Sequence, residues 1–233
     1  CGHCGGGFRP VASTLVRRAV MKRIAIVACC CLTTTACVDR LEPPLPPTHR
    51  QIEQVQDWSH KRSGPYDIPE TALRAYAYAA WAVAKQKNCN LGWPTLAALG
   101  ESLSNHGRAN DSQLGDDGIT TVPLRGLNLF DPAHPQEVAD TDAGLFDGDP
   151  TKDIPIGPLQ IMPSRWEQFN AAVEPDAKPN PDNINDASLT LAGFLCSVGD
   201  PSTPDGWANG VQQINANPEF VKHVHAIAKK YSR

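Results

Sequence analysis

A long stretch between Ala109 and Ile156 is rich in Gly, Pro and Asp, and segments with helical periodicity flank it on both sides. Pro and Gly interrupt regular elements, and Asp beside Gly is typical of turns. A loop of this length is uncommon inside a compact domain and is usually functional. The sequence therefore predicts that this loop forms one wall of a cleft in an otherwise helical domain.

Before the loop, apolar residues recur at helical spacing over about 69–87 and 93–104. Pro69 suits a first helical turn, and Asp67 is a candidate cap for the first of these helices. The second is expected to end where Asn105 and Gly107 interrupt it.

After the loop, Ser164 and Glu167 have the spacing of a capping box at the start of "RWEQFNAAV". Residues 183–186 are suited to cap the apolar run "ASLTLAGFLC". Two more helices are expected over "TPDGWANGVQQIN" and "NPEFVKHVHAIAKKY", the last with Asn217 as cap and Pro218 at its first position. No run of alternating β-branched residues indicates a strand, so the fold is predicted to be mainly α.

The front of the chain has the pattern of an export signal. Met21 is followed by two basic residues, a short apolar run and the small residues "TTTAC". "TTAC" fits a lipobox, which predicts a lipidated Cys37 on the outer face of a membrane; an ordinary secretory signal cut near Ala36 is the alternative. Residues 1–36 are thus assigned to the signal and upstream residues, and the "CGHC" within them is given no function.

Beyond the signal, "VDRLEPPLPPTHR" contains four prolines and favours extended polyproline II backbone. We therefore predict a Pro-rich tether over 37–65 and a single domain over 66–233. Without the five basic residues of 1–36, the total of 21 leaves 16 Lys and Arg against 25 Asp and Glu, a net charge of −9. This charge argues against nucleic acid or an anionic membrane surface as a partner.

Two cysteines remain in the part of the chain that is predicted to be exported. Of the eight in the chain, five lie in residues 1–36 and Cys37 is the lipid candidate, so Cys89 and Cys196 remain. In an oxidising compartment these two are expected to form one disulfide, worth about 4 kcal/mol for a loop of that length.

Three segments together resemble one known family: "CNLGWPTLAALGESLSNHGR", "DTDAGLFDGDPTKDIPIGPLQIMPSRW" and "PDNINDASLTLAGFLCSVGDPSTPDGW". With "IPETALRAYAYAA" before them, they are similar to lytic murein transglycosylases of the membrane-bound B type, in the form found in actinobacteria. The resemblance covers nearly all of residues 68–233. It implies a lysozyme-like α domain that binds the glycan strands of peptidoglycan.

The chemistry that the resemblance implies needs one acid. A glutamic acid protonates the oxygen that leaves between N-acetylmuramic acid and N-acetylglucosamine, then accepts a proton as the muramyl 6-hydroxyl closes a 1,6-anhydro ring. Ordinary glycosidases use two carboxylates, whereas here the second nucleophile belongs to the sugar. No cofactor takes part.

This chain departs from the family at the acid. Aligned without gaps from Trp93, the acid's position is filled by Leu103, and Glu101 lies two residues upstream. Two residues of a helix are about 200° apart, so if Leu103 faces the cleft, Glu101 faces nearly the opposite way. A helix that ended early, at Gly100, would return Glu101 to the cleft; an alignment with residues 103–104 inserted would also keep it as the acid.

The remaining site residues come from the same resemblance. Gly157 is expected to let backbone approach a ligand, Gln160 to offer its amide to acetamido groups, and Met162 to give an apolar wall. Where the family has Tyr before Asn in the helix that closes the cleft, this chain has Ile214. The full set of expected sugar-binding residues is Ser104, Asn105, Gly157, Pro158, Leu159, Gln160, Met162 and Asn215.

Two functions therefore remain open. One is an exported lytic transglycosylase with Glu101 as a displaced acid, acting in cell-wall turnover. The other is a catalytically inactive protein that binds glycan strands and scaffolds other wall enzymes. Acidic residues crowd the loop at 140–153, but their spacing is not that of a calcium loop, so no metal is predicted.

Overall fold

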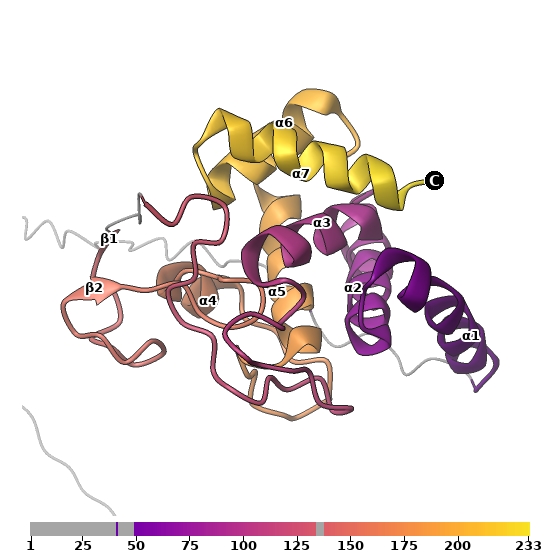
Figure 1. The fold of residues 1–233 in the computed structure, drawn as a ribbon, viewed down its shortest axis with the longest axis horizontal. Helices are drawn as coiled ribbons and strands as arrows, with labels where there is room; N and C mark the ends of the chain where they lie inside the picture. The colour runs from indigo at the N-terminus through magenta and orange to yellow at the C-terminus, as the bar shows by residue number, and fades with distance from the viewer. Residues whose placement is uncertain (1–40, 42–48, 134–137) are drawn as a thin grey trace, which may run out of the picture. The chain divides into compact units, whose positions relative to one another are not determined.

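The computed structural model describes residue 41, residues 49–133 and residues 138–233. The predicted export signal, the lipidation site Cys37 and most of the proline run lie outside the described residues. The described part holds seven helices and one pair of two-residue strands (Figure 1), so the prediction of a mainly α fold is confirmed. None of these helices combines the length and hydropathy needed to cross a membrane.

Helix α5 (Ile184–Ser197) is the centre of the core. Its side chains are buried almost all round, as expected for a helix with no polar face. Asn183 caps it through a hydrogen bond from the backbone N–H of Asn185, as predicted. Helix α2 (Glu70–Lys87) packs against it with one apolar face, and the disulfide between Cys89 and Cys196, also predicted, ties the chain after α2 to the end of α5.

Helices α3 (Trp93–Ser104) and α7 (Pro218–Tyr231) pack against each other, and α6 (Pro204–Ile214) packs on α7 (Figure 1). Asn217 caps α7 and Pro218 occupies its first position, as predicted. Phe220, Val224, Ile227, Ala228 and Tyr231 form the buried face of α7.

Helix α1 (His49–Tyr66) occupies residues that the sequence analysis assigned to the extended tether. Its aromatic side chains explain why it is folded onto the domain: Trp58 and Tyr66 both contact the ring of Trp93, at centroid distances of 5.1 and 6.2 Å. Leu41, also in that range, is buried beside Gly193 of α5.

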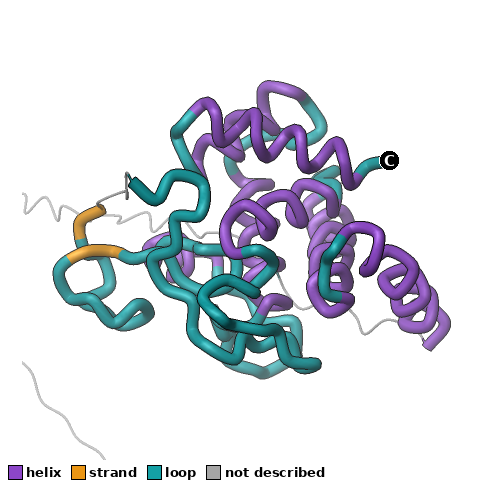
Figure 2. The backbone as a smooth tube through the Cα atoms, viewed as in Figure 1, coloured by secondary structure: helices purple, strands orange, loops and turns teal. Residues whose placement is uncertain are grey.

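The long loop runs along one side of the helices (Figure 2). Within the described residues it forms one antiparallel pair of strands, β1 (Val138–Ala139) with β2 (Lys152–Asp153), together with isolated antiparallel bridges and turns. The short α4 (Pro163–Phe169) follows.

Two predicted caps are wrong. Met162, not Ser164, precedes α4, no side chain caps the helix, and Pro163 occupies its first position. Asp67 does not cap α2 either, because its carboxylate accepts from the guanidinium of Arg108, at 3.0 Å.

Candidate functional site

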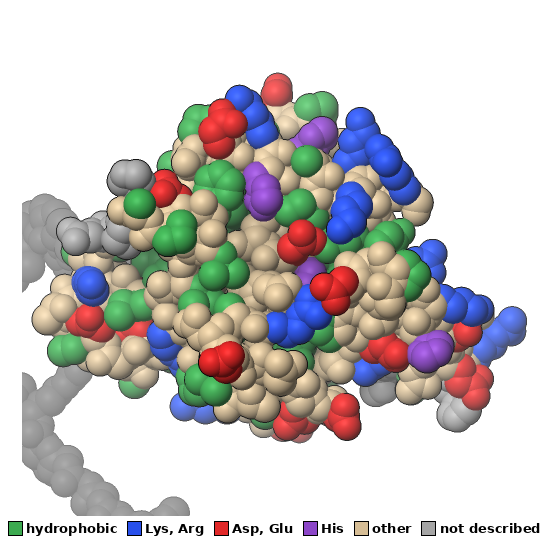
Figure 3. Space-filling view, viewed as in Figure 1, with side chains coloured by type: hydrophobic (Ala, Val, Ile, Leu, Met, Phe, Trp, Pro, Cys, Tyr) green, Lys and Arg blue, Asp and Glu red, His purple; other side chains and the backbone are tan. Residues whose placement is uncertain are grey.

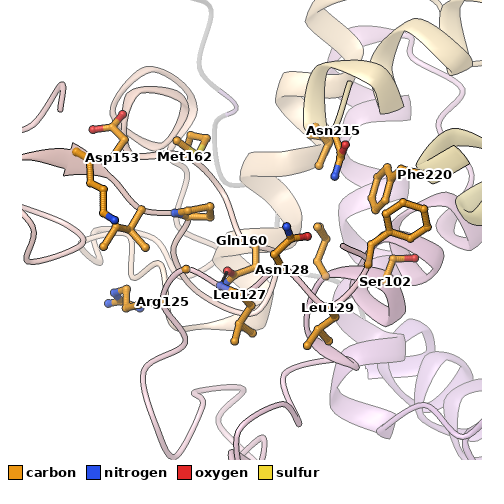
Figure 4. Close-up of a pocket in the computed structure, with 17 residues that line it drawn as sticks. Ser102, Arg125, Leu127, Asn128, Leu129, Asp153, Gln160, Met162, Asn215 and Phe220 are labelled. Carbon is orange, nitrogen blue, oxygen red and sulfur yellow. Dashed lines mark hydrogen bonds between the residues drawn. The ribbon is translucent and has the colours of Figure 1, made fainter. Parts of the chain in front are cut away.

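A cleft of about 290 Å³ lies between the helices and the long loop. The end of α3 and the loop segment 125–130 form one part of it, and residues 152–162 form the opposite wall (Figure 4). The α6–α7 junction closes it with Ile214, Asn215 and Phe220. The sequence prediction that the long loop walls a cleft is confirmed.

The last turn of α3 presents Leu103 to this cleft. The helix runs without interruption to Ser104, and Asn105 ends it in the left-handed conformation, φ 52°. The early helix end at Gly100 is therefore wrong. Leu103 is half-buried and packs against the core, so the position that the family gives to its acid holds an apolar side chain in this structure.

Glu101 lies on a different face of the same helix. Its carboxylate accepts a hydrogen bond from the hydroxyl of Tyr231 on α7. The described residues that line the cleft include Ser102 and Leu103 and leave out Glu101. The two side chains therefore lie on different faces of α3, in the sense that helix geometry predicts.

Tyr231 belongs to a chain of buried hydrogen bonds. Its hydroxyl lies 3.5 Å from Nε2 of His106, whose Nδ1 lies 3.1 Å from the hydroxyl of Tyr76. Since Tyr231 donates to Glu101, its oxygen accepts from Nε2–H, and Nδ1 then accepts from Tyr76, which assigns the His106 tautomer from the network. Every donor in this chain has an acceptor.

Burial fixes the protonation of this network. It lowers the pKa of His106 to about 3, with the nearby Arg108 charge as the second cause. Burial also raises the pKa of Tyr231 well above its ordinary value, and the hydrogen bond to Glu101 raises it further. At neutral pH the imidazole is thus neutral and both phenols keep their protons.

Gln160 reaches the cleft, but both ends of its amide are engaged within the protein. Nε2 donates to the carbonyl of Gly157 at 2.6 Å, and Oε1 accepts from the N–H of Leu127 at 2.6 Å. Gln160 therefore fastens the turn to the loop wall as well as lining the cleft.

Gly157 was expected to let a ligand approach the backbone closely. The structure shows another reason why a glycine is required at this position. Its φ is 71°, and a Cβ at this position would lie 1.9 Å from the carbonyl oxygen of Pro181. The glycine is required because two backbone segments meet here.

Four other predicted residues also lie outside the cleft lining. Ser104 is fully buried, where its hydroxyl donates to the carbonyl of Pro158 and accepts from the N–H of Gly107. The Asn105 side chain accepts from Arg108 at 2.9 Å. Pro158 and the fully buried Leu159 belong to the turn behind the wall. These residues shape the cleft without lining it.

The predicted residues that the structure brings together in the cleft are Gln160, Met162 and Asn215, with Leu103 at the acid's position. Sequence reasoning missed Phe130 and Phe220, whose rings meet at 5.3 Å with an interplanar angle of 81°. Phe220 belongs to the buried face of α7, and Phe130 lies in a loop without periodic spacing. The signal that could have identified Phe130 was its place as an aromatic residue in a loop predicted to form a wall of the cleft.

The cleft has one fixed ion pair at its edge. Arg125 binds Asp182 through both guanidinium nitrogens, at 2.6 and 2.9 Å, which ties the loop wall to the segment before α5. Among the described residues that line the cleft, Asp153 is the one carboxylate. It is 2% exposed and accepts from both the N–H and the hydroxyl of Thr141.

Carboxylate oxygens of Asp140, Asp142 and Asp153 lie within 4.8 Å of one another, which makes this group the candidate for a bound cation in the described part of the chain. The same oxygens hold the loop together. Asp142 accepts from the backbone of Gly144 and Phe146. The hydrogen bonds account for these acids without an ion.

Comparisons of the chain with protein-family models, with curated proteins and with solved structures each gave no match.

Proposed function

We propose that this protein binds the glycan strands of peptidoglycan in the cleft beside Leu103 and does not cleave them. The proposal rests on the resemblance of three sequence segments to lytic murein transglycosylases, which implies a lysozyme-like domain. It rests equally on the chemistry of the cleft. The observation that carries it is the division of α3: Leu103 lines the cleft, while Glu101 is bonded to Tyr231 on another face.

The position of Glu101 argues against the transglycosylase alternative. A general acid must reach the leaving oxygen within hydrogen-bonding distance, directly or through one water. Glu101 has its carboxylate on Tyr231, and turning it into the cleft requires unwinding the end of α3. Asp153, the acid in the cleft wall, is held by Thr141 and almost fully buried.

The lining of the cleft suits an acetylated sugar. Met162 and the ring of Phe130 offer apolar surfaces to the faces of pyranose rings, and Asn215 brings an amide to the junction of α6 and α7 (Figure 4). The exposed Lys152 adds a positive charge at the rim, which complements the carboxylates of wall peptides.

Export to the wall is part of the same proposal. A disulfide between Cys89 and Cys196 supports an oxidising compartment, and the lipobox-like segment supports a lipid anchor at Cys37. An anchored protein that holds glycan strands without cutting them would serve as a scaffold for the enzymes that act on the wall.

The proposal is tested by retention of the purified protein on insoluble peptidoglycan. Leu103→Trp adds a bulky ring to a cleft of about 290 Å³ and is expected to lower the affinity by about tenfold or more, because the ring occupies space that the sugar needs. The matched control is Leu145→Trp, the same change at a loop residue that is 75% exposed. Equal retention of the wild type and both variants would contradict the assignment of the cleft.

A further inference from the structure

A second cavity, of about 740 Å³, lies where the start of α3, the start of α6 and the C-terminal part of α7 meet. It shares no lining residue with the proposed glycan cleft among the described residues. Its size is within the range of pockets that hold small ligands, roughly 300–1,000 Å³. The proposed binding of glycan strands in the cleft beside Leu103 does not involve this second cavity.

The walls of this cavity are mainly apolar and one of them is held rigidly. Trp207 donates its indole N–H to the hydroxyl of Thr95 at 3.0 Å, which fixes the ring across the α6–α3 contact. His225 packs edge-on against it, with ring centroids 5.6 Å apart at 74°. Pro94, Pro204 and Val221 continue the apolar surface.

The rim of the cavity is basic. Four polar residues follow one another at spacings of three, four and three along α7 and its C-cap, so they form one stripe facing the cavity: Lys222, His225, Lys229 and the C-cap Ser232. The opposite face of α7 is the buried one. Figure 3 shows Lys and Arg side chains gathered over the C-terminal part of α7.

This positive charge stands out against an acidic protein, and it is only partly balanced. Lys222 pairs with Glu219 at 2.7 Å, and both side chains are well exposed. Lys229 has no acidic partner in the described part of the chain. No carboxylate is among the described residues that line the cavity.

The same lining disfavours a neutral sugar. Sugar hydroxyls are usually matched by carboxylate and amide side chains, and neither kind is among the described lining residues. An apolar wall with ammonium groups at its edge complements a ligand with an apolar body and one anionic group. We propose that this cavity binds a small amphipathic anion, with its chain or ring against Trp207 and its carboxylate or phosphate at Lys229.

The test follows the indole N–H resonance of Trp207 in the ¹⁵N-labelled protein, identified by its loss in Trp207→Phe. The probes are octanoate, octyl phosphate and the uncharged 1-octanol. Octanoate or octyl phosphate is expected to shift this resonance in a saturable way, and octanol at least about tenfold more weakly, because it lacks the charge. The two anions distinguish a carboxylate ligand from a phosphate one.

The matched variants are Lys229→Gln and Lys230→Gln, which remove adjacent charges. Lys230 lies over the ring of Tyr231 at 5.3 Å and is not among the lining residues, so only Lys229→Gln is expected to weaken the anions, by about tenfold. Trp81, which lines another apolar cavity between α1 and α2, serves as the internal reference. Absence of a saturable shift at Trp207, or equal weakening by both variants, would overturn the proposal.

Discussion

The two faces of the last turn of α3 are built in contrasting ways. One face presents Leu103 to a cleft whose walls come from a long, mostly irregular loop. The other places Glu101 against α7, in a buried chain of hydrogen bonds that runs through Tyr231 and His106 to Tyr76. Glu101 is thus on the face that packs against α7, and the face that lines the cleft has no acid in this turn.

The contrast teaches what a carboxylate needs in order to do chemistry. Glu101 accepts a hydrogen bond from Tyr231, but it does not line the cleft in which a substrate bond could reach it. The cleft encloses free volume, but position 103, which lines it, holds a leucine and no acid. A shift of two residues along a helix moves a side chain about 200° around it, which is enough to place it on a different face.

The largest effect is expected from restoring an acid on the cleft face. Leu103→Glu places a carboxyl in an apolar, half-buried position, where burial raises its pKa toward that of a general acid. We expect release of anhydromuramyl sugars at least about a hundredfold above the wild type, and more when Ile214→Tyr adds a phenol. Mass spectrometry of the soluble products measures it.

The control for this gain is Leu103→Gln, which has nearly the same shape and no titratable proton. Products from Leu103→Gln at the level of Leu103→Glu would contradict a role for the acid. Intact folding of Leu103→Glu with no products would show that this cleft cannot present a scissile bond.

The second-largest effect concerns His106, in the network on the other face, and the dependence of the protein's stability on pH. The pKa of His106 is about 3 in the folded protein and 6.5 in the unfolded chain, so between these values the unfolded state binds the extra proton. Stability is therefore lost as the pH falls from about 6.5 toward 3, by roughly 1 kcal/mol per pH unit. Urea unfolding between pH 7 and pH 4 measures the slope.

His106→Gln is expected to flatten this slope, because no imidazole remains to be protonated. His60→Gln is the control, since the His60 side chain is 79% exposed and lies outside the network. A pH slope unchanged by His106→Gln would contradict the assignment of His106 as a buried neutral residue.

The smallest effect is expected from changing the hydrogen bond that joins Glu101 to Tyr231. Glu101→Gln weakens the hydrogen bond from Tyr231, and Tyr231→Phe removes that bond together with the one from His106; each should cost about 1–2 kcal/mol of unfolding free energy. Retention on peptidoglycan should stay unchanged, because neither residue lines the cleft. Glu219→Gln, at an exposed carboxylate, is the matched control for stability.

Much of the scaffold could be predicted because its signals are local. Helices α2 and α3 follow from apolar spacing, and the capped start of α7 follows from Asn217 and Pro218. The disulfide followed from counting cysteines, since Cys89 and Cys196 are the two left once the predicted signal and the predicted lipidation site Cys37 are set aside. The long loop was recognisable from its composition alone.

What could not be predicted depends on contacts between distant residues. Helix α1 is folded because Trp58 and Tyr66 meet Trp93, which its own proline-flanked sequence does not reveal. Gly157 is dictated by the carbonyl of Pro181 behind it. Tyr231 reaches Glu101 from the last turn of α7, so the partner of the acid is fixed by packing alone.

The most direct test of the central claim is mass spectrometry of peptidoglycan incubated with the purified protein, beside Glu101→Gln and a pull-down of the same protein on insoluble peptidoglycan. The account predicts that wild type and Glu101→Gln both bind and that neither releases anhydromuramyl products. Anhydromuramyl products from the wild type that disappear in Glu101→Gln would contradict it, and would establish Glu101 as a working acid despite its bond to Tyr231.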